Sequence, residues 1–216
     1  MGRQTGKNHP KRNLDLPNSE IFWTHRGLYE ILNSIPLEAK SFLDVGCGRG
    51  IIGALLRIYR KPESAVGIDV SIEYLDFCAK MNFYDKLQQF ELGQKALPFR
   101  DGEFDVATCI EVIEHLPKDI GVNLLSELER VAETVIITTP TFSYSQRTFD
   151  ANPYQRHLSG WSGADFTKRG YRVRGIGEFM FFRRRIRYLS FFLSPFAHVM
   201  PRFSETLLAC KTEHSR

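Results

Sequence analysis

The chain has 216 residues, 43% of them hydrophobic, which is enough for one α/β domain with a full core and too few for two ordinary domains. The net charge of +4 is concentrated in two short basic segments, residues 1–13 and 183–187, so the rest of the chain is mildly acidic. This distribution excludes a broad basic face for duplex nucleic acid, because such a face needs lysines and arginines spread over one surface.

The N-terminal region is predicted to be a flexible arm followed by a helix. Residues 1–16 are basic and contain no apolar periodicity, so we expect no packed structure there. From Pro17 a helix is expected to run to about Leu32, because apolar side chains recur at helical spacing. We therefore assign residues 17–216 to a single domain.

An apolar run that ends in a carboxylate and three glycines stands out at residues 41–50, Ser-Phe-Leu-Asp-Val-Gly-Cys-Gly-Arg-Gly. Glycines after a buried strand allow a tight turn into a helix, expected here over 50–60, and let a nucleotide approach the backbone. The third glycine comes one residue earlier than in the dinucleotide pattern G-x-G-x-x-G. The pattern indicates a nucleotide-cofactor loop that is not of the dinucleotide type.

A second apolar strand, predicted over 65–69, ends at Asp69. Its distance from the glycines is about that at which α/β nucleotide folds place a ribose-binding carboxylate. Asp69 could also serve as an acidic residue at the start of the next helix, with Ser71 as the helix cap. The two roles are compatible.

The remaining segments continue the alternation of helices and strands. Helices are expected over about 72–82, 120–132 and 162–169, and strands over about 90–92, 104–110, 135–139, 171–175 and 206–210. Such alternation is typical of an α/β fold whose mostly parallel sheet is covered by helices on both faces. With the two strands above, seven strands are predicted.

Four segments in this order resemble the motifs of class I S-adenosylmethionine-dependent methyltransferases. They are Leu43–Gly50, Gly67–Ser71, Leu97–Ala107 and Glu111–Leu116. The resemblance is greatest to the branch that includes the ubiquinone-pathway O-methyltransferases and many small-molecule methyltransferases. It implies a Rossmann-like, seven-stranded sheet and S-adenosylmethionine as the cofactor, with S-adenosylhomocysteine as the product.

The resemblance also implies which residues bind the cofactor. The glycine loop would hold the methionine half, and Asp69 the ribose. Gln94 stands where an acidic residue is common at the adenine position, and its amide could hydrogen-bond the adenine. The full expected set is Asp44, Gly46, Cys47, Gly48, Gly50, Asp69, Val70, Gln94, Ile110 and Glu111.

Methyl transfer to a hydroxyl needs alignment of the acceptor and removal of its proton. Two histidines are candidate bases: His115, just after the fourth strand, and His157, on the loop after the fifth. Each could instead have a structural role, His115 as a helix-end residue hydrogen-bonded to the backbone. We expect His115 and His157 to be the catalytic residues.

A divalent metal is an alternative at the same place. Glu111, Glu114, His115 and His157 offer oxygen and nitrogen ligands of the kind that suits Mg²⁺ or Mn²⁺. The segment also resembles the small-RNA 3′-terminal 2′-O-methyltransferases, in which similar residues bind a metal. Those enzymes carry a second histidine directly after the first, where this chain has Leu116. We therefore predict a site without a metal.

Aromatic and basic side chains are concentrated between residues 179 and 196, and we expect residues 179–203 to form an insertion before the last strand. The segment is too short and too charged to span a bilayer. It could lie on a membrane surface with its arginines toward anionic headgroups. Alternatively, its apolar residues pack on the sheet while the arginines face solvent or a substrate phosphate.

We therefore expect a methyltransferase that acts, most simply, on an oxygen of a small-molecule or lipid-linked acceptor. The alternatives are a metal-assisted RNA 2′-O-methyltransferase and a cofactor-binding subunit without catalysis. The four cysteines form no C-x-x-C pair, which argues against a disulfide framework. We expect Cys47 and Cys109 to be small buried residues near strand ends. We expect a cytoplasmic protein with peripheral membrane contact through residues 179–196, and no nucleic-acid partner.

Overall fold

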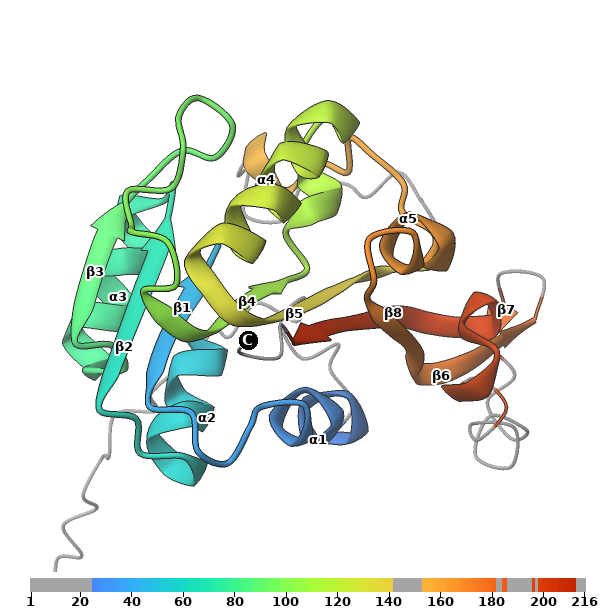
Figure 1. Cartoon of the computed structure of the whole chain (residues 1–216), viewed down its shortest axis with the longest axis horizontal. Helices are drawn as coiled ribbons and strands as arrows, with labels where there is room; N and C mark the ends of the chain where they lie inside the picture. The colour runs from blue at the N-terminus through green and yellow to red at the C-terminus, as the bar shows by residue number, and fades with distance from the viewer. Residues whose placement is uncertain (1–24, 142–152, 182–183, 186–195, 197, 213–216) are drawn as a thin grey trace, which may run out of the picture.

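The structure, a computed structural model, describes residues 25–141, 153–181, 184–185, 196 and 198–212 (Figure 1). The predicted arm at residues 1–16 and the start of the first predicted helix lie outside these residues.

The helices are α1 (His25–Asn33), α2 (Ile51–Tyr59), α3 (Ile72–Met81), α4 (Lys118–Val131) and α5 (Gly163–Thr167). The strands are β1 (Ser41–Val45), β2 (Ser64–Asp69), β3 (Lys86–Gln89), β4 (Phe104–Ile110), β5 (Ala132–Pro140), β6 (Arg172–Phe181), β7 (Arg184–Arg185) and β8 (Ser204–Thr212). Short 3₁₀ turns are η1 (Ile113–His115), η3 (Pro153–Gln155) and η4 (Pro201–Phe203).

One sheet organises the described residues, with the strand order β3-β2-β1-β4-β5-β8-β6-β7. The first five strands in this order are mutually parallel, β8 runs antiparallel to both β5 and β6, and β7 adds two residues beside the end of β6. The predicted α/β class and the mostly parallel sheet are confirmed. The order reverses direction between β1 and β4, where open α/β sheets place their ligand crevice.

The third strand lies earlier than predicted. It covers Lys86–Gln89 rather than 90–92, because it pairs with β2 from Val66 to Asp69 and so must start directly after Asp85. The Asp85 carboxylate accepts a hydrogen bond from the backbone N–H of Ala65, which fixes this register. The strand forms the edge of the described sheet, and Leu87 is its one apolar residue, so it lacks the apolar run of the buried strands.

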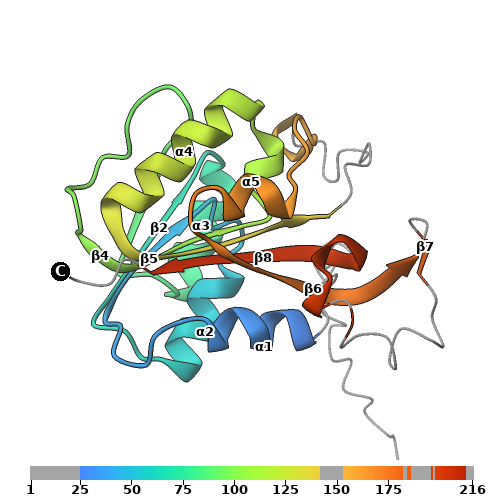
Figure 2. The ribbon, with the colours of Figure 1, turned by 45° about the vertical axis from the view of Figure 1, so that its right-hand side comes forward.

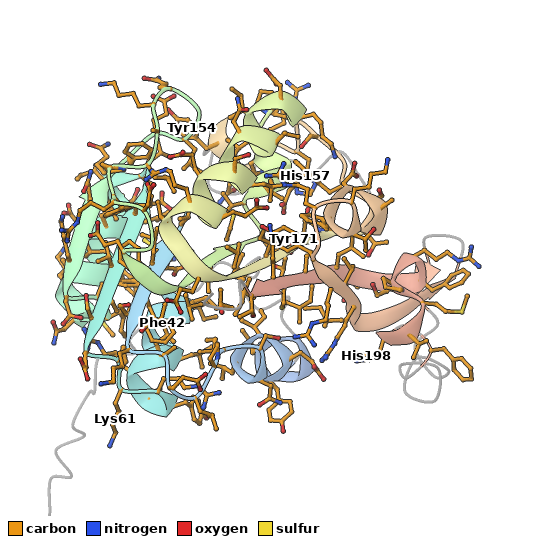
Figure 3. All side chains as sticks on the ribbon, viewed as in Figure 1. Phe42, Lys61, Tyr154, His157, Tyr171 and His198 are labelled. Atoms are coloured by element: carbon orange, nitrogen blue, oxygen red, sulfur yellow. The ribbon has the colours of Figure 1, made fainter. Side chains whose placement is uncertain are left out.

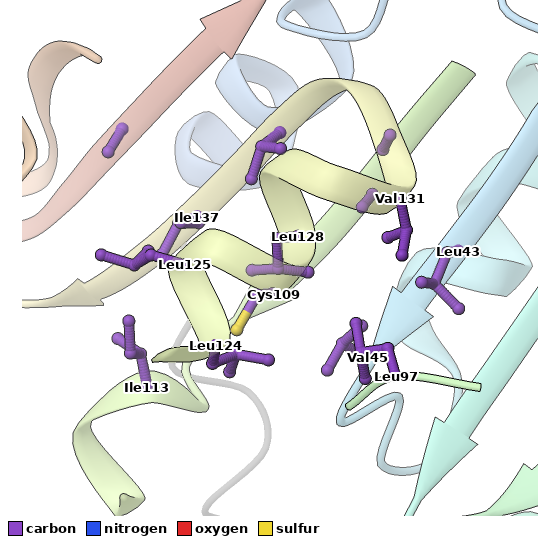
Figure 4. Close-up of a cluster of buried hydrophobic side chains, with 14 of the residues drawn as sticks. Leu43, Val45, Leu97, Cys109, Ile113, Leu124, Leu125, Leu128, Val131 and Ile137 are labelled. Carbon is purple, nitrogen blue, oxygen red and sulfur yellow. The ribbon is translucent and has the colours of Figure 1, made fainter. Parts of the chain in front are cut away.

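Helices cover both faces of the sheet, as Figure 2 shows. On one face, α1 and α2 pack on alternate strand residues such as Phe42 and Val106, and α3 packs beside them. On the other, α4 packs over the centre of the sheet through Leu124, Leu125 and Leu128 (Figure 4). Cys109 lies in this core and, like Cys47, is buried, as predicted.

Strand β6 continues to Phe181, well beyond its predicted end at residue 175. The first residues of the predicted insertion, 179–181, therefore belong to the sheet. Within the described residues, none of the helices combines the length and apolarity needed to cross a bilayer.

Candidate functional site

The glycine loop joins β1 to α2 at the carboxyl edge of the sheet. The backbone N–H groups of Gly46 and Cys47 donate to the carbonyl of Ile68 at 2.8 and 3.0 Å, which ties the loop to β2. Gly46, Gly48 and Gly50 all have positive φ angles, between 52° and 79°, a region that favours glycine. A Cβ at Gly48 would meet no atom within 4 Å, so the loop leaves open space on the side where a ligand could approach.

Asp69 links this loop to the start of α3, one carboxylate oxygen to each. Oδ2 accepts a hydrogen bond from Gly48 N–H at 2.9 Å, and Oδ1 accepts one from Ser71 N–H at 2.8 Å. The Ser71 side chain accepts from Tyr74 N–H, which confirms Ser71 as the cap of α3. The acid after β2 is therefore in direct contact with the glycine loop.

Asp44 lies below the loop and is 3% exposed. The hydroxyls of Tyr84 and Thr108 donate to its two oxygens at 2.6 and 2.7 Å. Burial raises the pKa of Asp44 to about 6, although these two hydrogen bonds lower it. Sequence reasoning missed both hydroxyls, because neither belongs to a motif and the three residues come from different elements.

The other expected cofactor residues are more dispersed. The Cys47 side chain is buried in a small core cluster. Val70 accepts a hydrogen bond at its carbonyl from Gln89, and the exposed Gln94 donates to the Glu91 carboxylate at 2.6 Å. Ile110 is half-buried at the end of β4.

Glu111 has a φ of 54°, which is unusual for a residue with a side chain. Its N–H donates to the carbonyl of Thr138 at 3.1 Å. This turn leads directly into Val112, whose side chain packs against Gly46: a Cβ at Gly46 would lie 2.4 Å from Val112 Cγ2. The glycine loop and the segment after β4 are therefore in contact.

The structure brings Glu114, His115 and His157 together. One side-chain ligand atom from each lies within 4.8 Å of the other two, and the two imidazole rings are 5.0 Å apart. The backbone carbonyl of Glu114 accepts hydrogen bonds from Leu158 and Ser159, which draws the segment carrying His157 against η1. Figure 3 labels His157, near the start of α4. Glu111, the fourth residue of the alternative metal set, is not in this group.

Burial is the largest cause of the pKa shifts in this group and in Glu111, whose charge interacts with that of Glu114. It raises the pKa of Glu114 to about 8 and that of Glu111 well above its usual value. It lowers the pKa of His115 and, with the field of that residue, lowers the pKa of His157 to about 4. Both imidazoles are therefore neutral at pH 7 and can accept a proton.

Several polar atoms of this group and of the neighbouring Glu111 are buried without a hydrogen-bond partner. Among the described residues they include Glu111 Oε1, Glu114 Oε1 and His115 Nδ1. Glu114 Oε2, in contrast, accepts a hydrogen bond from the Thr139 hydroxyl at 3.1 Å. Free oxygen and nitrogen donors close together fit either a divalent cation or a polar group of a substrate.

Gln155, in the segment after β5, contacts α3 next to the glycine loop. Gln155 Nε2 donates to the hydroxyl of Tyr74 on α3 at 3.3 Å, and the Arg49 guanidinium lies over the Tyr74 ring at 5.5 Å. Tyr154 is 51% exposed, whereas Trp161 is 4% exposed and stacks on Phe166 in the core. From their positions in the sequence, Tyr144, Tyr154 and Trp161 are candidates for the wall of an acceptor pocket, and Tyr144 lies outside the described residues.

Comparisons with known proteins agree with this geometry. Residues 43–134 match the family model described as "Methyltransferase domain". The chain is 30% identical over 120 residues to a ubiquinone biosynthesis O-methyltransferase of Thiobacillus denitrificans, covering 49% of this chain and 48% of the relative. It is 29% identical over 123 residues to a small RNA 2′-O-methyltransferase of Arabidopsis thaliana, covering 50% of this chain and 13% of the relative.

The fold also matches solved structures. A SAM-dependent methyltransferase from Archaeoglobus fulgidus superimposes with a TM-score of 0.62 at 17% identity, covering 86% of this chain and 91% of that one. At that identity the likeness concerns the fold. The chain spans less than half the length of both sequence relatives, so their substrates are not carried over by similarity alone.

Proposed function

We propose that the protein methylates a hydroxyl oxygen of a small-molecule or lipid-linked acceptor, because residues 43–134 match a methyltransferase-domain model and the fold is that of a SAM-dependent methyltransferase. The observation that carries this proposal is the contact between the glycine loop and the segment that bears Glu114 and His115. The glycine loop and the two imidazoles therefore lie at the same edge of the sheet, which supports the proposal.

The geometry of the loop supports the cofactor roles that the family resemblance implies. The open space at Gly48 suits the methionine half of S-adenosylmethionine, with Asp44, Gly46, Cys47 and Gly50 shaping the loop. Asp69 would accept the ribose hydroxyls, since each carboxylate oxygen keeps acceptor capacity beside its one backbone hydrogen bond. Val70, Gln94, Ile110 and Glu111 would complete the site around the adenine and ribose.

S-adenosylmethionine, when bound, supplies an electrophilic methyl group on a sulfonium sulfur. The protein's task is to align the acceptor oxygen and to take its proton. Either His115 or His157 can do this as a neutral imidazole, and their rings are close enough to share one acceptor. Glu114, with a pKa of about 8, stays largely protonated at pH 7 and can donate a hydrogen bond.

The acceptor class is supported by the relative's name and by the C-terminal segment. The similar Thiobacillus denitrificans protein is a ubiquinone biosynthesis O-methyltransferase. Residues 179–196 are rich in Arg and Phe. At the end of this segment Phe196 is 59% exposed, and the nearby Val199 is 78% exposed. Such side chains suit peripheral contact with a membrane that carries a lipid-linked acceptor.

Binding and transfer are tested separately. Isothermal titration should show binding of both S-adenosylmethionine and S-adenosylhomocysteine, and failure of both would refute the cofactor assignment. Tritiated methyl groups should then enter the lipid or metabolite fraction of a lysate. Incorporation into RNA alone would refute the acceptor class, and no incorporation would favour a subunit without catalysis.

A second candidate is metal-assisted RNA 2′-O-methylation. The specific observation in its favour is the group of Glu114, His115 and His157, with unpartnered donor atoms on the first two. These residues would hold a divalent cation, which would lower the pKa of a bound hydroxyl. Transfer into RNA that is lost on treatment with a chelator and restored by Mg²⁺ or Mn²⁺ would support this candidate over the first.

A further inference from the structure

Tyr84 lies beneath the glycine loop, in the short connection between α3 and β3, and is 5% exposed. Its hydroxyl donates a hydrogen bond to Asp44 Oδ2 at 2.6 Å and accepts one from the backbone N–H of Gly53 at 3.1 Å. One hydroxyl therefore connects the end of β1 to the first turn of α2. These are the two elements that the glycine loop joins.

The Tyr84 ring occupies space that three glycines leave free. A Cβ at Gly53 would lie 2.4 Å from Cζ of this ring, and Cβ atoms at Gly67 and Gly50 would lie 3.2 and 3.3 Å from other ring carbons. These glycines come from α2, β2 and the loop itself. The absence of their side chains allows the ring to reach Asp44.

The position of Tyr84 is fixed by its neighbours in the chain. Asp85 accepts a hydrogen bond from Ala65 N–H at 2.7 Å and pairs with Arg57 of α2 at 2.7 Å. Arg57 Nε also donates to the carbonyl of Phe83 at 3.1 Å. The residues on both sides of Tyr84 are thus anchored to β2 and α2, so the tyrosine is held rigidly against the loop.

We propose that Tyr84 is a positioning residue for S-adenosylmethionine: it holds the Asp44 carboxylate and the start of α2 in the arrangement that the glycine loop needs to bind the cofactor. This inference rests on the proposed function, because it concerns the same cofactor. It adds a residue that no family motif in the sequence indicated.

The hydroxyl also affects the charge of Asp44. Burial raises the pKa of Asp44 to about 6, the hydrogen bonds from Tyr84 and Thr108 lower it, and the charge of Asp69 raises it. Other titratable groups that interact with Asp44 are Cys47 in the loop, Cys78 on α3 and Cys109 on β4.

Removing the Tyr84 hydroxyl should therefore raise the pKa of Asp44 further, so that less of it is ionised near neutral pH. A cofactor with sulfonium and ammonium charges would then bind less tightly, since a buried carboxylate below its loop would lose negative charge.

The test is Tyr84→Phe, which keeps the ring, with Tyr171→Phe as a matched control. Tyr171 is also buried, at 3% exposure, but it packs under α5 away from the loop. The dissociation constant of S-adenosylmethionine is measured by titration calorimetry between pH 5 and 8. We expect Tyr84→Phe to weaken binding about tenfold near neutral pH, the effect of losing one hydrogen bond to a charged group.

The pH dependence separates positioning from a general loss of structure. In the wild type, affinity should fall below about pH 6, and in Tyr84→Phe this inflection should move to higher pH. Unchanged affinity, or equal weakening at every pH with the inflection unmoved, would overturn the inference. Tyr171→Phe should change neither quantity.

Two further measurements keep the outcome interpretable. Thr108→Val removes the other hydrogen bond to Asp44 and should move the inflection in the same direction, even if Tyr84→Phe does not fold; an unmoved inflection would contradict the inference. The carboxyl ¹³C shift of Asp44, followed by NMR in the ligand-free protein, should titrate at higher pH in Tyr84→Phe. If the wild type binds neither S-adenosylmethionine nor S-adenosylhomocysteine, the proposed function fails, whereas the NMR titration still tests the Tyr84–Asp44 pair.

Discussion

Alanine at Gly48 should impair cofactor binding at a modest loss of stability, whereas alanine at Gly46 should destabilise the fold more strongly. Both glycines have positive φ angles, 52° and 70°, and alanine in that region costs about 1–2 kcal/mol. At Gly46 the new Cβ would also lie 2.4 Å from Val112 Cγ2, and such overpacking costs about 1–3 kcal/mol more. At Gly48 the new Cβ would meet nothing within 4 Å.

Gly102 provides a matched control for Gly48. Its φ is 62°, and a Cβ there would also meet nothing within 4 Å. It lies in the turn before β4, at the amino edge of the parallel strands, whereas the glycine loop lies at their carboxyl edge. Gly48→Ala and Gly102→Ala should therefore lower the free energy of unfolding by a similar amount, about 1–2 kcal/mol. Gly46→Ala should lower it by about 2–5 kcal/mol.

Urea unfolding and calorimetric titration with S-adenosylhomocysteine measure the two effects. Gly48→Ala should weaken binding about tenfold or more, because the added methyl group would occupy the space that faces the ligand. Gly102→Ala should bind like the wild type. Wild-type affinity in Gly48→Ala would show that the cofactor does not lie on this loop, and equal stability of the Gly46 and Gly48 variants would refute the packing of Gly46 on Val112.

Three further predictions concern the acidic and imidazole groups. Asp69→Ala loses the hydrogen bonds to Gly48 and Ser71. Calorimetry should show that the dissociation constant of S-adenosylmethionine rises about tenfold or more, and unchanged affinity would contradict both the loop contact and the ribose role. If His157 is the base, His157→Ala should lower the rate of methyl transfer about 10²-fold or more and leave cofactor affinity unchanged. The wild-type rate should then fall only as the pH approaches about 4, the pKa of His157, and a loss of rate between pH 7 and 6 would argue against this histidine. The pKa of Glu114 in the folded state, about 8, lies above its ordinary value, so the unfolded chain loses this proton at a lower pH than the folded protein does. The free energy of unfolding should therefore fall as the pH rises from 5 to 8. Urea unfolding of Glu114→Gln should show a smaller fall, and the same pH dependence as the wild type would contradict the burial of this carboxyl.

Local sequence was enough to predict most of the fold. The strands at Ser41–Val45 and Phe104–Ile110 are apolar and buried, and glycines mark the loop after the first of them. Strand β3 was predicted at the wrong residues, because its Lys-Leu-Gln-Gln sequence has no apolar pattern and its register is set by Asp85 and β2. An edge strand of this kind is determined by its partner rather than by its own composition.

The candidate site divides in the same way. The sequence by itself determined the glycine loop and the acid at Asp69, because backbone geometry at a strand end depends on neighbouring residues. Only the tertiary structure decided that Tyr84 supports Asp44, and that His157 meets His115 and Glu114. Those contacts join residues about 40 positions apart in the chain. They form because separate elements are packed at one edge of a sheet, and a local sequence pattern does not predict that packing.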